Sequence, residues 1–148
     1  MTDSGKPRPR RDRGTTVLEL VIALVIFGVL LTVAIGGWHR LADQRAVAGA
    51  GTTLRSAFAT ARRAAVARTT PVAVRLDAVA GRAVIHAGSD TILVHPLAAA
   101  FGVRLLATRD SMAYDAAGLG AGAANLSAVL TRGAAAETVI VARLGRVR

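Results

Sequence analysis

An apolar stretch near the N-terminus constrains this chain more than any other feature of its sequence. From Val17 to Trp38 the only charged side chain is Glu19. A helix needs about 20 largely apolar residues to cross roughly 30 Å of hydrocarbon, so the stretch predicts a membrane-spanning helix. A carboxylate costs about 2.5 to 3.5 kcal/mol at the middle of a bilayer and less near its surface. Glu19 therefore needs an explanation of its own.

The charges on either side of the stretch predict its orientation. Five basic residues precede it, namely Lys6, Arg8, Arg10, Arg11 and Arg13, whereas Arg40, Asp43 and Arg45 follow it. The positive-inside rule then places the N-terminus in the cytoplasm and the C-terminal part of the chain outside it. Residues 1–14 contribute +3 to the formal net charge of +10, so the rest of the chain carries +7.

Two simpler interpretations of the stretch stay open at this point. A cleaved secretory signal fits the basic start and the apolar core, but the A-x-A match at Ala46-Val47-Ala48 lies beyond a long polar spacer. A plain signal anchor, carrying an ordinary membrane-anchored module, explains everything except Glu19 and the Gly14-Thr15-Thr16 lead-in.

The residues around Glu19 resemble a known export signal. The segment GTTVLEL, from Gly14 to Leu20, is similar to the class III signal of type IV prepilins and type II secretion pseudopilins. The resemblance implies that a prepilin peptidase cuts after Gly14, that Thr15 becomes the new N-terminus, and that Glu19 is the fifth mature residue. It also implies N-methylation of Thr15, although the usual first mature residue of the family is phenylalanine.

Glu19 has two physical interpretations. The amino group that cleavage frees on Thr15 lies about one helical turn away, and the same amine of an adjacent subunit would pair with Glu19 where water is scarce. The alternative is that Glu19 complements the positive end of the helix dipole, which stabilises a helix by about 0.3 to 1 kcal/mol. The preceding glycine favours the intersubunit ion pair.

The rest of the chain predicts an α+β fold, a long helix packed on an antiparallel sheet. The helix is expected to continue to Arg68 because alanine is frequent, proline is absent until Pro71, and apolar residues recur every three or four positions, at Val47, Gly51, Leu54, Phe58, Ala61 and Ala65. Half-buried strands are expected at residues 72–77, 82–87, 91–96, 102–107, 111–114, 125–130 and 138–144. Residues 116–125 are expected to form a loop.

Three segments resemble the GspH/FimT branch of the pilin superfamily: Leu54 to Asp77, Met112 to Gly118, and Thr138 to Arg148. The resemblance implies a pilin-like fold with four regions. Residues 1–14 are the cleaved leader, 15–37 a transmembrane and filament-core helix, 38–68 its amphipathic half, and 69–148 an exported β-rich domain.

The function implied by this resemblance is that of a minor pseudopilin, a structural subunit of the type II secretion pseudopilus that supports protein secretion across the envelope. The alternative is a FimT-like minor pilin in type IV pilus assembly or DNA uptake. The implied partners are other pilins or pseudopilins, the prepilin peptidase and an inner-membrane assembly platform. The implied location is the inner membrane, crossed once, with the C-terminal domain in the periplasm.

Catalytic chemistry has no sequence signature in this chain. The absence of cysteine excludes disulfides, thiolate metal sites and thiol nucleophiles, and the three histidines, His39, His86 and His95, have no metal-ligand spacing. No nucleophile elbow, phosphate-binding loop or carboxylate pair occurs. The sequence therefore predicts no enzymatic activity, no cofactor and no metal.

The basic C-terminus is a candidate DNA-binding site. Arg143, Arg146 and Arg148 surround a glycine bend at Gly145 and are suited to contact phosphates, although arginines at a free end are also commonly just solvated. Five arginines either share one face or lie scattered, namely Arg62, Arg63, Arg104, Arg132 and Arg146. Because aromatic residues make up only 3% of the chain, base stacking is not expected. Any binding is predicted to be to duplex DNA, directed at the backbone and sensitive to salt.

Overall fold

A computed structural model describes residues 16–122 and 124–148 of the chain. Gly14 and Thr15, the predicted cleavage and methylation positions, lie outside the described residues. The chain divides into two compact units, one ending at Gly37 and the other running from Trp38 to Arg148.

Helix α1 runs from Val17 to Arg68. In its first part, up to Leu31, large apolar side chains are exposed on every side, among them Leu24, Phe27 and Leu30. An 18-residue window of α1 has a mean hydropathy of 2.8, and none of that window is buried in the protein. The helix is therefore long and apolar enough to cross a membrane, as the sequence predicts from length and composition.

The second part of α1 is amphipathic. The six positions of the predicted apolar stripe are all buried, from Val47 to Ala65. Ala50 and Ala57 extend the same face, while the neighbouring arginines Arg62 and Arg63 are exposed. The helix ends at Arg68, where Thr69 takes a left-handed φ of 51° and Pro71 follows two residues later. Both the stripe and the end of the helix are confirmed.

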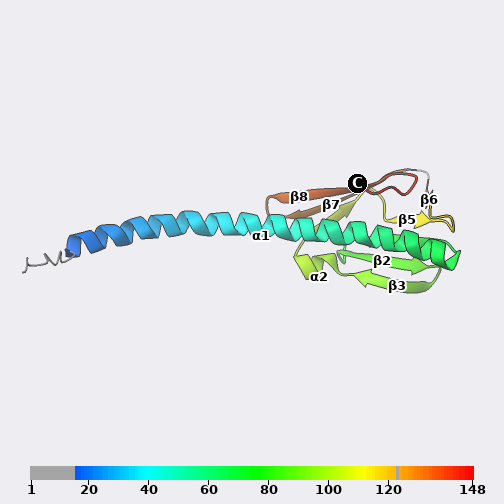
Figure 1. Ribbon diagram of the computed structural model, residues 1–148, viewed down its shortest axis with the longest axis horizontal. Helices are drawn as coiled ribbons and strands as arrows, with labels where there is room; N and C mark the ends of the chain where they lie inside the picture. Colours follow the sequence, from blue (N-terminus) through cyan, green and yellow to red (C-terminus); the bar gives the residue numbers. More distant parts are fainter. Residues whose placement is uncertain (1–15, 123) are drawn as a thin grey trace, which may run out of the picture. The chain divides into compact units, whose positions relative to one another are not determined.

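Two antiparallel sheets complete the second unit. Sheet A has the order β3-β2-β1-β5-β6, and sheet B has the order β4-β7-β8. The strands of sheet A are β1 (Val72–Asp77), β2 (Arg82–Ala87), β3 (Asp90–His95), β5 (Ser111–Tyr114) and β6 (Gly120–Ala121). The strands of sheet B are β4 (Arg104–Ala107), β7 (Leu126–Arg132) and β8 (Ala135–Val141). In Figure 1, β7 and β8 lie along one side of the second part of α1, and β2 and β3 lie along the other.

The predicted α+β class is confirmed, whereas three local expectations were wrong. A short helix, α2 (Leu97–Phe101), follows Pro96 and ends at Gly102, whose φ of 64° is left-handed. The last strand begins at Ala135 and stops at Val141, earlier than expected at both ends. The expected loop at residues 116–125 contains β6, whose Gly120 pairs with Tyr114.

The hydrophobic core lies entirely between Val47 and Val141. Its largest fully buried side chains include Tyr114 of β5, Phe58 and Leu54 of α1, and Ile85 of β2. No polar or charged residue among those described is buried in it. The core is therefore made by the second unit alone, with α1 covering the inner faces of the strands.

We predict that Phe58→Ala lowers the free energy of unfolding of the second unit by about 3 to 5 kcal/mol, since it removes a large side chain from a packed core. Phe58 is 0% exposed, whereas Phe27 is 66% exposed, so Phe27→Ala is a matched control that is expected to leave stability unchanged. Chemical denaturation of the full chain in detergent micelles, followed by circular dichroism, measures both. Equal losses in the two variants would contradict this assignment of the core.

Candidate functional site

Glu19 lies in the first turn of α1, on a surface that is otherwise apolar. Its backbone N–H donates to the Thr16 hydroxyl oxygen at 3.3 Å, so Thr16 caps the start of the helix. The side chains of Val17, Leu18 and Leu20 around it are all exposed. Glu19 forms no ion pair within the part of the chain that the structure describes. The position suits both interpretations of Glu19, since the carboxylate lies at the positive end of the helix and is open to a partner.

The last four residues, Gly145–Arg148, form a C-terminal strap that pairs with the end of β8. Ile140 and Arg148 exchange two backbone hydrogen bonds, of 3.1 and 2.8 Å. Val141 and Val147 form an antiparallel bridge, and the N–H of Ala142 donates to the carbonyl of Arg146 at 2.8 Å. The side chain of Val147 packs against the core, while Arg146 and Arg148 are exposed. The arginines at the end of the chain are therefore held on ordered backbone.

Tyr114 anchors the turn that leads into the strap. Its hydroxyl donates to the carbonyl oxygen of Gly145 at 3.2 Å. Gly145 has a φ of 85°, and a Cβ built there would lie 2.5 Å from the Tyr114 ring, so only glycine fits this turn without displacing it. Burial raises the pKa of Tyr114 to about 12, with the charge of Arg62 acting in the opposite direction.

A groove of about 580 Å³ lies between α1 and the strap. Three arginines line it, Arg62 and Arg63 from α1 and Arg146 from the strap, together with the aromatic rings of Phe58 and Tyr114. We call it the basic groove. It joins residues more than eighty positions apart in the sequence, and nothing in the local pattern pointed to Tyr114 as the residue that links them.

The other candidate arginines lie elsewhere. Arg104 and Arg132 line a separate groove beside Gly102. Arg132 is held in the structure, because its Nε lies 2.9 Å from Oδ1 of Asp43 and its NH1 donates to the carbonyl of Phe101 at 2.6 Å. The five arginines that the sequence left open are therefore divided between two grooves. Arg143 and Arg148 are exposed and line neither.

The second unit carries a large excess of positive charge. Residues 38–148 contain fourteen arginines and six carboxylates, a formal charge of +8. Four of the six carboxylates pair with arginine in the described residues, namely Asp43, Asp77, Asp90 and Glu137. Arg62, Arg63, Arg143, Arg146 and Arg148 take part in none of these four pairs, so their charge is available to an anionic partner.

Across residues 16–122 and 124–148, no group of three or more His, Asp or Glu side chains is placed to hold a metal ion.

The comparisons with known proteins agree with this architecture. Residues 9–35 match the prokaryotic N-terminal methylation motif. The structure resembles the type IV minor pilin FimU of Pseudomonas aeruginosa in two crystal forms. The P21 form has a TM-score of 0.58 at 13% identity and covers 69% of this chain and 86% of that chain. The P65 form has a TM-score of 0.55 at 13% identity and covers 68% and 89%. No curated protein matches this chain by sequence.

The N-terminal motif and the fold agree with each other. The long helix has an exposed apolar N-terminal part, and its second part packs on antiparallel sheets. The chain has a type IV pilin-like fold and carries the prokaryotic N-terminal methylation motif.

We predict that Tyr114 makes stability depend on alkaline pH. The chain has one tyrosine, so the tyrosinate absorbance band reports Tyr114 alone, and ionisation is expected near pH 12 in the folded protein. The unfolded phenol ionises near pH 10. The contribution of the buried neutral phenol to the free energy of unfolding is therefore complete below pH 10. It falls by on the order of 2 kcal/mol as the pH rises from 10 to 12.

The variant Tyr114→Phe tests this linkage, because it keeps the ring and removes the ionising group. Its free energy of unfolding, measured by denaturant titration across the alkaline range, is expected to lack that decline. A wild-type ionisation near pH 10, or an unchanged decline in the variant, would show that the hydroxyl is not buried beneath the strap.

Proposed function

We propose that this protein is a minor subunit of a type IV filament, with a structural rather than catalytic role. The observation that carries the proposal is Glu19, a lone carboxylate exposed in the first turn of an exposed apolar helix and inside the matched methylation motif. An apolar helix surface with one charge suits a helix that first lies in lipid and then packs among similar helices around a filament axis.

Processing is the first step of the proposed function. A prepilin peptidase removes residues 1–14 by cutting after Gly14, and Thr15 becomes the methylated N-terminus. Residues 15–37 then serve as membrane anchor and filament core, 38–68 as the amphipathic half of the helix, and 69–148 as the exported domain. The methylation motif over residues 9–35 supports this division at its N-terminal end.

The intersubunit ion pair is the second step. The carboxylate of Glu19 forms an ion pair with the Thr15 ammonium group of an adjacent subunit. A helix dipole contributes about 0.3 to 1 kcal/mol to such a carboxylate, while insertion at mid-bilayer costs about 2.5 to 3.5 kcal/mol. Glu19 lies in the first turn of the helix, where the cost is lower. The amine of the neighbour offsets this cost and favours the assembled state over the free subunit.

The proposed location is the inner membrane, with the N-terminus in the cytoplasm and the globular domain in the periplasm. Five basic residues before the apolar stretch support this orientation. The assembly partners are then other pilins and the inner-membrane platform that extracts the subunit.

The sequence resemblance predicts two alternative filaments. The likeness to the minor pilin FimU supports the type IV pilus. The type II secretion pseudopilus stays a prediction. Deletion of the gene separates them, because loss of surface pili with intact protein secretion indicates the pilus, and the reverse indicates the pseudopilus.

A second candidate function is capture of duplex DNA, supported by the basic groove and the strap. Arg62, Arg63 and Arg146 line the basic groove. Arg143 and Arg148 are exposed and lie close to Arg146 in the sequence. Guanidinium groups on ordered backbone are suited to bind phosphate oxygens.

We predict that Glu19→Gln abolishes filament incorporation while cleavage continues. The amide keeps the size of the side chain and removes the charge that pairs with the amine. Intact-mass analysis is expected to show loss of residues 1–14 in both wild type and variant, and sheared filaments are expected to contain the wild type only. Thr16→Ala is the control for the helix-start interpretation, since it removes the cap and leaves Glu19 intact. Normal incorporation of Glu19→Gln, or an uncut leader in wild type, would overturn the proposal.

We predict that Arg146→Gln with Arg148→Gln weakens binding of duplex DNA and makes it less sensitive to salt. Each lost phosphate contact lowers the slope of log affinity against log salt by about 0.9, so the double variant is expected to lose about two. Fluorescence anisotropy with the full chain in detergent micelles measures this. The control is Arg104→Gln with Arg109→Gln, which removes the same charge away from the basic groove. Equal effects of the two pairs would show that net charge alone attracts the DNA.

A further inference from the structure

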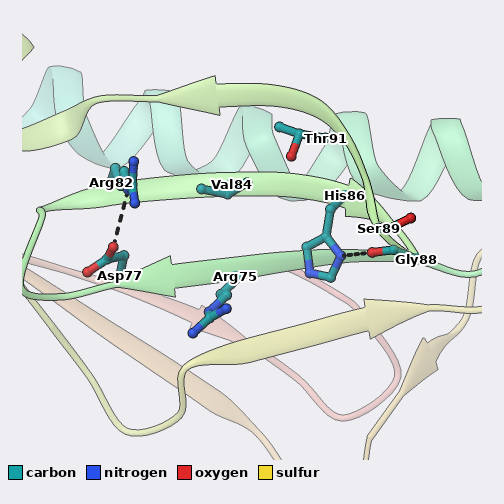
Figure 2. A pocket seen from close by; sticks show the side chains of 8 residues that line it. All are labelled: Arg75, Asp77, Arg82, Val84, His86, Gly88, Ser89 and Thr91. Atoms are coloured by element: carbon teal, nitrogen blue, oxygen red, sulfur yellow. Dashed lines mark hydrogen bonds and ion pairs between the residues drawn. The ribbon is translucent and has the colours of Figure 1, made fainter.

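A second polar pocket lies on the outer face of sheet A. Alternation along β1 places Val72, Val74 and Leu76 in the core, so Arg75 and Asp77 lie on the opposite face. On β2, Ala83 and Ile85 are buried in the same way. The pocket has a volume of about 390 Å³, and Figure 2 shows it with α1 behind the strands.

The strand register brings three nitrogen-bearing side chains together in this pocket. Val84 lies directly opposite Arg75, so Arg82 and His86, two residues to either side of Val84, are the diagonal neighbours of Arg75. Diagonal Cβ atoms in an antiparallel pair are about 7 to 8 Å apart, within reach of long side chains. Figure 2 shows Arg75 on β1 between Arg82 and His86 of β2.

Asp77, the only carboxylate among the described residues that line the pocket, is already hydrogen-bonded through both oxygens. Oδ1 of Asp77 accepts the backbone N–H of Ala80 at 2.9 Å, and Oδ2 accepts Nε of Arg82 at 3.2 Å. The Ala80 hydrogen bond holds the pKa of Asp77 below its usual range. Desolvation opposes it, and the hydrogen bond and charge of Arg82 lower the pKa further. Within residues 16–122 and 124–148, Arg75 forms no ion pair. The pocket therefore has an uncompensated positive charge.

The acids on the neighbouring strands form no ion pair with Arg75 among the described residues. Oδ2 of Asp90, at the start of β3, lies 3.5 Å from NH1 of Arg68 on α1. Asp110, before β5, keeps its negative charge and accepts, at 3.2 Å, the hydroxyl of Ser111, the residue opposite Arg75.

The imidazole of His86 has a fixed orientation. Nδ1 lies 3.0 Å from the carbonyl oxygen of Gly88, and because a carbonyl only accepts, Nδ1 carries the hydrogen. Nε2 is then the nitrogen left for a ligand, and it donates when the ring is protonated. Ser89 and Thr91 line the pocket as well, and their hydroxyls are further donors.

We propose that this pocket binds one oxyanion group, a phosphate or a carboxylate, through the guanidinium of Arg75 and the imidazolium of His86. Arg82 adds positive charge while it holds Asp77 away from the ligand. The planar fork of an arginine matches both kinds of oxyanion. The pocket shares no residue with the basic groove.

Histidine NMR of the full chain in detergent micelles tests the site. The chain has three histidines, so His39 and His95 are internal controls for His86. Inorganic phosphate is titrated in one arm and acetate in the other, at constant ionic strength and at a pH where the His86 signal shows a protonated ring. The His86 signal is expected to move and saturate in at least one arm, while the other two move little. The arm that saturates identifies the oxyanion.

Two variants of equal charge decide whether the pocket is responsible. Arg75→Gln is expected to weaken the apparent affinity about tenfold or more, in line with about 1.5 to 3 kcal/mol for a charged hydrogen bond. Arg104→Gln removes an exposed arginine of sheet B and is expected to leave the titration unchanged. Unsaturable shifts shared by all three histidines, or equal effects of the two variants, would overturn the proposal. Backbone spectra of both variants confirm that the fold is retained.

Discussion

Close approach of α1 to the strands is the constraint on which the rest of the second unit depends. Small residues on the buried face of the helix allow it. A Cβ at Gly51 would lie 2.5 Å from Oε1 of Glu137, and one at Gly49 would lie 2.9 Å from the ring of Phe101. The space left at Gly51 admits the Glu137 carboxylate, whose Oε1 lies 2.6 Å from NH1 of Arg55. A larger residue at Gly51 would displace the Glu137 carboxylate, and one at Gly49 would displace the Phe101 ring.

This packing also determines where charge is exposed. Arg55 and Arg132 lie next to the contact between α1 and sheet B and pair with Glu137 and Asp43. Partly buried pairs of this kind position the elements more than they stabilise them, since an exposed pair contributes about 0 to 1 kcal/mol. The inner faces of both sheets are covered by α1, so the remaining arginines lie on outer faces, on the exposed side of the helix and on the strap. The basic groove and the outer pocket are consequences of that arrangement.

The sequence pattern predicted those features that depend on residues close together in the chain. The helix end at Arg68 and the strands at 72–77, 82–87 and 111–114 were predicted to the residue, because proline, glycine and alternating side chains act over a few positions. Helix α2 was missed because a run of three alanines has no periodicity to distinguish a helix from a loop. The early start of β8 was missed for the same reason, since Ala135 and Ala136 give no strand signal.

The sequence pattern did not predict which candidate functional residues lie together in the folded protein. Arg146 and Arg62 line the same groove because the strap pairs with β8 and because Tyr114 hydrogen-bonds Gly145, 31 positions later in the sequence. Tyr114 is the only tyrosine of the sequence, but this alone does not indicate that it links these residues. The sequence pattern says more about the pocket on the outer face of sheet A, because alternation alone places Arg75 and Asp77 on one face of β1. What alternation does not give is the register, which decides that Arg82 opposes Asp77 and that His86 is diagonal to Arg75.

Threonine at position 15, in place of the phenylalanine usual in the prepilin family, is consistent with the proposed ion pair. In the proposed pair, the group that meets Glu19 is the α-amino group that cleavage would free, and every amino acid supplies one. Methylation of an amine retains its positive charge. The proposed charge pairing thus requires cleavage after Gly14 and the carboxylate of Glu19, and it does not require phenylalanine at position 15.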